Sequence, residues 1–275
     1  MIASPDDELL EAAKRGDEDA LTALIERYQP RIYGFGMKMC RNPEDAQDIV
    51  QDTLLAAART VRDFRGASSV STWLYAIARS FCIKKRRKSK FAPEHVLSLD
   101  SQSARGAFEL PDRGRAPDQV LHDRQVRQAL EEAVGGLEPA YREVLILRDM
   151  EGLTAAEVAE VMELSVDAVK SRLHRARASV RRALLPWLDP AAATAGGPGC
   201  PDIVRLFSHH LEGEINPDSC AEMERHLAQC GRCQAACDSL KDTLRLCRSG
   251  PQPRVPPAIQ ASIKAGIRAL VAGKG

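Results

Sequence analysis

Residues 137–185 read LEPAYREVLILRDMEGLTAAEVAEVMELSVDAVKSRLHRARASVRRALL and decide the fold. Pro139 suits the first turn of a helix, and Gly152 can end that helix in the left-handed conformation. Thr154 and Glu157 form a capping box, which predicts that a second helix begins at the residue after the threonine. Two short helices joined by a tight turn are therefore expected.

A third, strongly basic helix follows. Ser165 can cap it, and Val166, Val169 and Leu173 form its inward stripe. The outward face carries a run of cations with no acid among them: Lys170, Arg172, Arg175, Arg177, Arg181 and Arg182. This pattern predicts a helix-turn-helix whose last helix contacts DNA phosphates.

The alternative is a solvated amphipathic helix, because charge runs usually face water. The capped preceding helix and the short turn favour DNA binding. Asp167, Ala168, Ser171 and Arg172 lie early enough on the helix to reach base edges, while the other cations neutralise phosphates.

Composition indicates an all-α protein of two or three modules. The chain has 275 residues, a formal net charge of +1 and only 4% aromatics. No stretch approaches the ~18 apolar residues of a membrane span, and the acidic N-terminus does not resemble a signal peptide, so we expect a cytoplasmic protein without membrane contact. Disulfides are rare there, and six of the eight cysteines lie between Cys200 and Cys247, which indicates a metal site.

Pattern breaks divide the chain into six segments. The segments are a helical module at 1–90, a flexible linker at 91–117, the helix-turn-helix module at 118–185, a linker at 186–199, a Cys/His module at 200–248 and the tail at 249–275.

The tail contains a helix with an apolar stripe of Ile259, Ile263, Ile267 and Leu270. We expect this stripe to pack on the chain's own body rather than on a partner or a membrane.

Three stretches of the sequence, in the order in which they occur, resemble the extracytoplasmic-function group of bacterial RNA polymerase sigma factors of the sigma-70 family. They are RNPEDAQDIVQDTLLAAARTVRDFRG, VSTWLYAIARSFCIKKRRK and the stretch quoted first, and the resemblance covers about residues 8–185. It implies a non-enzymatic subunit that binds the β′ clamp and β flap of core RNA polymerase and promoter DNA. The first stretch resembles sigma region 2, and the helix-turn-helix resembles region 4.

An acidic and amide stripe follows one side of a helix in the first stretch. Alone it would be a solvated face, but the resemblance implies that it contacts a coiled coil of the polymerase β′ subunit. Its members are Asp45, Asp48, Gln51 and Asp52.

The second stretch sets aromatics beside cations, a combination that suits single-stranded DNA. The resemblance implies that it melts and reads the −10 element. Trp73 is explained equally well as a core residue, so the basic residues are the firmer part of this prediction. The predicted −10 residues are Trp73, Tyr75, Arg79, Lys84, Lys85, Arg86 and Arg87.

For the third stretch the resemblance implies reading of the −35 element. Glu163 stands where the family usually has glycine, so a left-handed residue there would be strained. Asp167 favours the helix dipole but repels phosphate, which suggests an altered −35 preference. The predicted −35 residues are Asp167, Ala168, Lys170, Ser171, Arg172, His174, Arg175 and Arg177.

The segment HLAQCGRC offers His226, Cys230 and Cys233 as ligands of one structural zinc ion, which needs four. Cys200 and Cys220 are the candidates for the fourth. The stretch CPDIVRLFSHHLEGEI with ERHLAQCGRC resembles the zinc-finger domain of zinc-associated anti-sigma factors, and this resemblance favours Cys200.

Reduced cysteines without metal are the alternative, and His209 and His210 are weaker ligand candidates. A catalytic zinc of the deaminase kind is disfavoured, because no His-x-Glu accompanies the Cys-x-x-Cys.

The order of modules suggests regulation within one chain. A linker of about fourteen residues spans roughly 20 Å on average, so the Cys/His module would stay near the helix-turn-helix at high effective concentration. We therefore expect an intramolecular contact that restrains DNA or polymerase binding. The competing functions are a helix-turn-helix regulator that does not load polymerase and a zinc-dependent nucleic-acid enzyme.

Overall fold

A computed structural model describes residues 5–66, 68–91, 117–188, 199–250 and 252–272. Within these ranges the regular structure is helical and no strand occurs, so the predicted all-α fold is confirmed. Most of the predicted linkers at 91–117 and 186–199 falls outside the described residues. No helix in the described part of the chain combines the length and hydropathy needed to cross a membrane.

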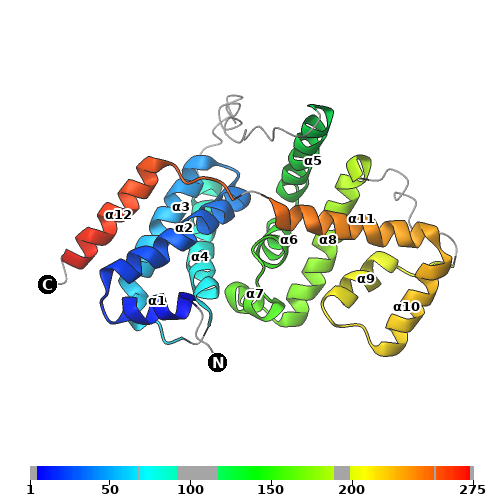
Figure 1. Cartoon of the computed structure of the whole chain (residues 1–275), viewed down its shortest axis with the longest axis horizontal. Coiled ribbons are helices and arrows are strands. Elements are labelled where there is room, and N and C mark those ends of the chain that lie inside the picture. The colour runs from blue at the N-terminus through cyan, green and yellow to red at the C-terminus, as the bar shows by residue number, and fades with distance from the viewer. Residues whose placement is uncertain (1–4, 67, 92–116, 189–198, 251, 273–275) are drawn as a thin grey trace. The chain divides into compact units, whose positions relative to one another are not determined.

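The chain divides into two compact units (Figure 1). The first unit contains four N-terminal helices, a short 3₁₀ turn and the last helix of the chain. They are α1 (Pro5–Lys14), α2 (Glu18–Cys40), α3 (Pro43–Thr60), η1 (Val61–Asp63), α4 (Val70–Phe91) and α12 (Pro257–Ala272).

Local signals set the start of α3. Asn42 lies in the extended conformation, and its side-chain oxygen accepts hydrogen bonds from the backbone N–H groups of Glu44 and Asp45 at 2.8 and 3.2 Å. Pro43 occupies the first helical position, where its missing N–H costs nothing. The core between the helices is aliphatic and aromatic, with Leu24, Ile32, Phe35, Ile49, Leu54 and Tyr75 buried.

The second unit contains most of the helix-turn-helix and the whole Cys/His module. Its elements are α5 (Pro117–Gly135), α6 (Pro139–Leu145), a π-helical turn η3 (Ile146–Met150), α7 (Ala155–Met162), α8 (Val166–Leu188), α9 (Ile203–Leu211), α10 (Pro217–Gln229) and α11 (Gly231–Ser249). Helices α9 and α11 both pack against α8.

The predicted helix signals are confirmed around the turn. Gly152 has a φ of +81°. The Thr154 backbone N–H donates to Glu157 Oε2 at 2.9 Å, and the Glu157 backbone N–H donates to Thr154 Oγ1 at 3.2 Å. Ser165 accepts from the N–H of Ala168 at 3.2 Å, which caps α8. The helix-turn-helix is therefore built as its sequence predicts.

Helix α4 begins at Val70, the first residue of the second stretch that resembles the sigma factors. The basic helix of the helix-turn-helix runs further than the sequence indicated. Helix α8 continues through Pro186 to Leu188, three residues into the stretch predicted to be a linker. Pro186 leaves the carbonyl of Arg182 without its helical partner, and Arg182 is exposed, so water can satisfy that carbonyl.

Candidate functional sites

Four side chains of the Cys/His module converge. Cys200 precedes α9, His226 lies in the last turn of α10, Cys230 caps α11, and Cys233 lies in its first turn. Their ligand atoms all lie within 4.8 Å of one another. Cys200 Sγ lies 3.9 Å from Cys230 Sγ, and His226 Nε2 lies 3.2 Å from Cys233 Sγ.

These distances fit zinc. Two sulfurs of a tetrahedral zinc site lie about 3.8 Å apart when each Zn–S bond is ~2.3 Å. Three thiols and one imidazole form a closed ligand set, and such a set holds an ion for structure rather than for catalysis. When bound, zinc would join the ends of α10 and α11 to the residue preceding α9.

Only one candidate for the fourth ligand lies in this cluster. Cys220 Sγ instead lies 3.5 Å from His210 Nδ1 and 3.7 Å from Glu224 Oε1. Cys237 and Cys247 are buried in α11, where burial raises the pKa of the Cys237 thiol to about 11. The geometry thus selects Cys200.

The thiols of the cluster differ in their surroundings. Backbone and side-chain hydrogen bonds from Cys233 lower the pKa of Cys230, which caps α11. Burial and the neighbouring Cys230 and Cys200 raise the pKa of Cys233 to about 12. Crowded thiols resist ionisation together, and a divalent cation among them would remove that resistance.

The outward face of α8 is partly covered by the Cys/His module. Lys170 Nζ lies 2.7 Å from Glu214 Oε1, and His174 is buried against Ser208 and His209. Among the other residues predicted to bind the −35 element, Asp167, Ser171 and Arg175 are exposed, and Ala168 and Arg172 are half-buried.

Arg177 lies deepest on this face, only 1% exposed. Its guanidinium donates to both carboxylate oxygens of Asp149 at 2.6 and 2.8 Å and to Glu212 Oε1 at 2.7 Å. Glu212 also accepts from Arg148 Nε at 3.1 Å. Arg177 was predicted to contact DNA from the outward face, but in this structure it is an internal ion-pair residue.

A second arginine extends the contact along α8. Arg181 Nε donates to the carbonyl oxygen of Ala236 at 3.1 Å and lies 2.7 Å from Ser239 Oγ. Both partners belong to α11. Hydrogen bonds and ion pairs therefore join the Cys/His module to α8 over at least three helical turns, from Lys170 to Arg181.

The environment of His174 keeps its imidazole neutral. Burial, followed by the proximity of His209 and of Arg177, lowers the pKa of His174 to about 4. His174 Nδ1 lies 2.6 Å from Ser208 Oγ, and its Nε2 lies 3.1 Å from His209 Nδ1.

In the first unit, the residues predicted to bind polymerase lie along α3. Lys85 of α4 donates to Asp45 at 2.9 Å and to Asp48 at 2.5 Å, and these hydrogen bonds raise the pKa of Lys85. Gln51 donates to Ser262 Oγ of α12 at 3.1 Å. Asp52 is exposed.

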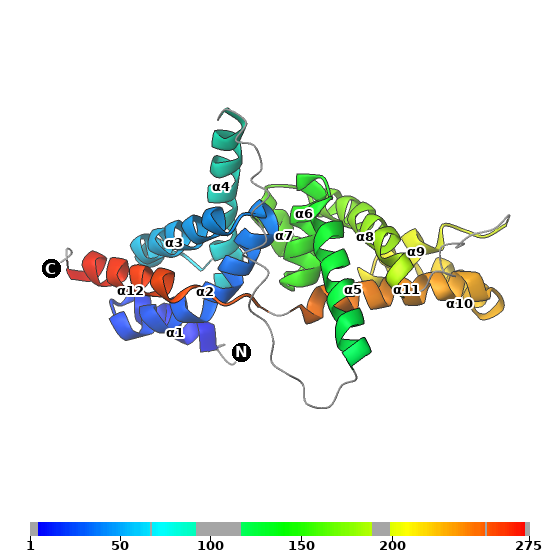
Figure 2. The ribbon, with the colours of Figure 1, turned by 90° about the horizontal axis from the view of Figure 1, so that it is seen from above.

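Helix α12 packs against α3 and α2 (Figure 2). Ile263 and Ile267 are buried, which confirms that the tail helix packs on the chain's own body. A Cβ added at Gly266 would lie 2.6 Å from Leu55 Cδ2, so the two helices approach closely there. Lys264 also pairs with Glu26 at 2.7 Å.

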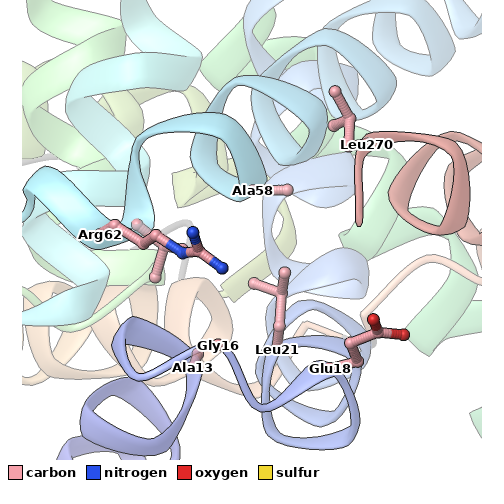
Figure 3. Close-up of a pocket in the computed structure, with 8 residues that line it drawn as sticks. Ala13, Gly16, Glu18, Leu21, Ala58, Arg62 and Leu270 are labelled. Atoms are coloured by element: carbon pink, nitrogen blue, oxygen red, sulfur yellow. The ribbon is translucent and has the colours of Figure 1, made fainter. Parts of the chain in front are cut away.

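A shallow hollow lies in the same unit. Ala13, Gly16 and Leu21 line it together with Leu270 of α12 (Figure 3). Its volume of about 40 Å³ is far below the ~300 Å³ of small-molecule sites. The hollow is thus a packing feature that α12 helps to enclose.

The residues predicted to bind the −10 element differ in exposure. Lys84, Arg86 and Arg87 are exposed. Trp73 is half-buried on Phe64, with ring centroids 4.8 Å apart, whereas Tyr75 is fully buried against Phe35. Arg79 is half-buried. A buried Tyr75 is a core residue in this structure, and the accessible part of the set is its basic part.

Comparison with known proteins decides the family. Residues 24–91 match the family model described as "Sigma-70 region 2", and residues 127–180 match "Sigma-70, region 4". The RNA polymerase sigma-H factor of Pseudomonas aeruginosa is 30% identical over 195 residues, covering 70% of this chain and all of that protein. The chain belongs to the extracytoplasmic-function RNA polymerase sigma factors.

Two further similarities are weaker. The sigma factor SigW of Bacillus subtilis is 28% identical, covering 64% of this chain and 94% of that protein. A solved structure of CnrH in complex with the cytosolic domain of CnrY is 25% identical, covering 66% of this chain and 98% of that chain, with a TM-score of 0.45. Residues 200–234 of this sigma factor match a further family, described as "Putative zinc-finger".

Sequence reasoning missed the acidic partners in this sigma factor. Glu212 and Glu214 stand in the stretch HHLEGE, directly after α9, and both pair with cations of α8. The signal that could have predicted this pairing is the presence of two acids in a module tethered behind a basic helix. The pairing of Lys85 with the region 2 acids was also missed, because those residues lie about forty positions apart in the sequence.

Proposed function

We propose that this sigma factor binds core RNA polymerase through the α3 face of region 2, melts the −10 element with α4 and reads the −35 element with α8. We further propose that its C-terminal segments restrain both activities in cis. The observation that carries the restraint is the engagement of Lys170, His174 and Arg177 by the Cys/His module.

The electrostatics of α8 support this proposal. Phosphate contacts position a recognition helix on DNA, and Lys and Arg make most of them. Here the carboxylate of Glu214 occupies a hydrogen-bonding position on Lys170 that a phosphate oxygen would otherwise take. Glu212 pairs with the buried Arg177, which Asp149 also binds. The same carboxylates would also repel DNA phosphates, so the module weakens DNA binding both by occupancy and by charge.

Contacts in the first unit support restraint of polymerase binding. Gln51, one of the four residues expected to face polymerase, donates to Ser262 of α12, and Leu55, one turn further along α3, packs against Gly266. A partner that docks on this part of α3 must first displace α12. Lys85 neutralises Asp45 and Asp48 on the same helix.

Zinc has a structural role in this proposal. Cys200, His226, Cys230 and Cys233 would hold it, and the ion would keep α9 in place relative to α10 and α11. Since Glu212 and Glu214 follow α9, the position of both acids depends on a folded module. Sigma factors act without enzymatic turnover, and a closed ligand set of this type leaves zinc no catalytic position.

Transcription from a promoter library tests the sigma function. Residues 1–188, which retain all of α8, are combined with core RNA polymerase and a library with randomised −35 and −10 sequences. We expect enrichment of two separated elements. Arg172→Ala should relax base preference in the upstream element, whereas Arg182→Ala, on an exposed later turn, should leave that preference unchanged.

The same experiment separates the competing function. A helix-turn-helix regulator that does not load polymerase would bind DNA without forming a complex with core polymerase. Failure of residues 1–188 to bind core polymerase in gel filtration would therefore contradict the sigma function, even if DNA binding persisted.

A further inference from the structure

A second group of metal-ligating side chains lies at the contact between α8 and α9. His174 comes from the middle of α8, His209 from the last turn of α9, and Glu214 from the turn that follows. His174 Nε2 lies 3.1 Å from His209 Nδ1 and 3.6 Å from Glu214 Oε2, and His209 Nδ1 lies 3.0 Å from Glu214 Oε2. One of the three residues, His174, lies outside residues 200–234, which match the zinc-finger family.

The triangle of donor atoms has the size of one face of a metal coordination sphere. Ligand atoms about 2.1 Å from an ion lie roughly 3.0 Å apart in octahedral geometry and roughly 3.4 Å apart in tetrahedral geometry. The three observed separations of 3.0, 3.1 and 3.6 Å run from the octahedral value to slightly beyond the tetrahedral value. A single ion can therefore reach all three atoms without a large movement of any side chain.

Neighbouring groups hold the donors in place. Ser208 Oγ contacts the other ring nitrogen of His174 at 2.6 Å and is itself contacted by Arg177 at 3.2 Å. The second oxygen of Glu214 accepts from Lys170 at 2.7 Å. Supporting hydrogen bonds of this kind, on the far nitrogen of a histidine and the free oxygen of a carboxylate, are typical of metal ligands.

Hydrogen bonds alone do not use all the lone pairs of the three donor atoms in this cluster. Three atoms that can each supply a lone pair face one another, and hydrogen bonds among them can use only the ring protons of the two histidines. One ion would use all three lone pairs at once. Lys170 and Arg177 oppose a cation here, while Asp149 and Glu212 offset them, so we expect weaker binding than at the three-cysteine site.

We propose that His174, His209 and Glu214 form a second metal site, for a first-row divalent transition ion that prefers nitrogen and oxygen ligands. Imidazole and carboxylate ligands suit Zn²⁺, Ni²⁺ and Fe²⁺. One ligand belongs to the helix-turn-helix and two to the Cys/His module, so the ion fastens the module to α8. Its effect on transcription rests on the proposed cis restraint, but its binding does not.

Metal stoichiometry tests the site directly. Untagged full-length protein is first loaded with one equivalent of Zn²⁺ and dialysed, and further Zn²⁺ is then added in a calorimeter. We expect a second equivalent to bind. His209→Gln should weaken that second equivalent at least ~10-fold and leave the first in place. His210→Gln, the neighbouring histidine of the same helix, is the matched control and should bind both equivalents as the native chain does.

Two results would overturn the proposal. One is a native chain that takes up only one equivalent, and the other is a His209→Gln chain that binds the second equivalent as tightly as the native chain. If His209→Gln misfolds and loses the first zinc, the same titration is made with Glu214→Gln. A Glu214→Gln chain that binds the second equivalent as tightly as the native chain would then overturn the proposal. Because the measurement counts ions and not transcripts, failure of this site is distinguishable from failure of the cis restraint.

Discussion

Glu163 occupies the turn between α7 and α8 with a φ of 56° and an exposed side chain. This left-handed conformation costs a residue with a Cβ about 1–2 kcal/mol of conformational free energy, and glycine does not incur this cost. Glycine also gives the unfolded chain more freedom, which offsets up to about 1 kcal/mol. We predict that Glu163→Gly raises the free energy of unfolding of the second unit by about 0.5–1 kcal/mol.

Urea unfolding in a Trp73→Phe background measures this change, because Trp187 is then the remaining tryptophan and lies in the second unit. Glu160→Gly is the matched control. It is also exposed but lies within α7, so it should lower stability by about 1 kcal/mol. Equal destabilisation by both variants would contradict the strain at Glu163.

Residue-level prediction succeeded where the signal is local. Gly152, Thr154, Glu157 and Ser165 act through partners within five positions, so their roles follow from spacing alone. Arg177 is the opposite case. Its partners Asp149 and Glu212 lie 28 and 35 positions away, and no periodic pattern distinguishes an arginine that meets phosphate from one that meets buried carboxylates.

At the scale of elements, the proposed restraint of α8 depends on the loop after α9. We predict that Glu212→Gln with Glu214→Gln strengthens binding of the full-length protein to a −35 duplex by about 10-fold, or ~1.4 kcal/mol. The substitutions remove two negative charges and release Lys170, while Arg177 stays paired with Asp149. Fluorescence anisotropy without added metal measures the change.

The control for this pair is Asp218→Asn with Glu222→Gln, which removes the same charge from exposed positions of α10. It should alter DNA affinity far less. If both pairs strengthen binding equally, net charge rather than contact with α8 would explain the effect.

Helix α12 is the second element of the proposed restraint. Burial of Ile263 and Ile267 stabilises its docking on α3 by about 3 kcal/mol or more. We predict that Ile263→Asp with Ile267→Asp releases α12 and strengthens binding to core polymerase. Ala261→Asp with Ala265→Asp adds the same charge to exposed positions and should leave binding unchanged. Gel-shift competition for core polymerase distinguishes the two pairs.

The elements themselves were predictable to within a few residues, because caps and apolar stripes are local. The apolar stripe of α12 predicted that the helix packs on the chain's own body, which the structure confirms. It could not predict that the helix packs on α3, because any apolar surface of matching width would satisfy the same stripe.

At the scale of the whole molecule, we propose that zinc supports the arrangement of the second unit. We predict that removal of zinc with a chelator unfolds the Cys/His module, uncovers α8 and raises DNA affinity to that of residues 1–188. Near-complete loss of helix content would contradict this, since α5–α8 have their own core of residues such as Val144, Leu147 and Leu173. Circular dichroism and anisotropy together measure both quantities.

The order of modules could be predicted from the sequence, since each module carries its own motif. The contact between the fused module and α8, on which the proposed restraint rests, could not. It depends on Glu212, Glu214 and Ser239 meeting α8, and each of these residues alone is compatible with a solvated surface.

The central claim is that one chain holds a sigma factor and its restraint. Promoter-specific transcription with core polymerase, comparing the full-length protein with residues 1–188 at equal concentration, tests it most directly. We predict that the truncated chain initiates at least ~10-fold more often from the same start site, and that chelation moves the full-length protein towards that level. Equal initiation by the two chains, with or without the chelator, would contradict the restraint.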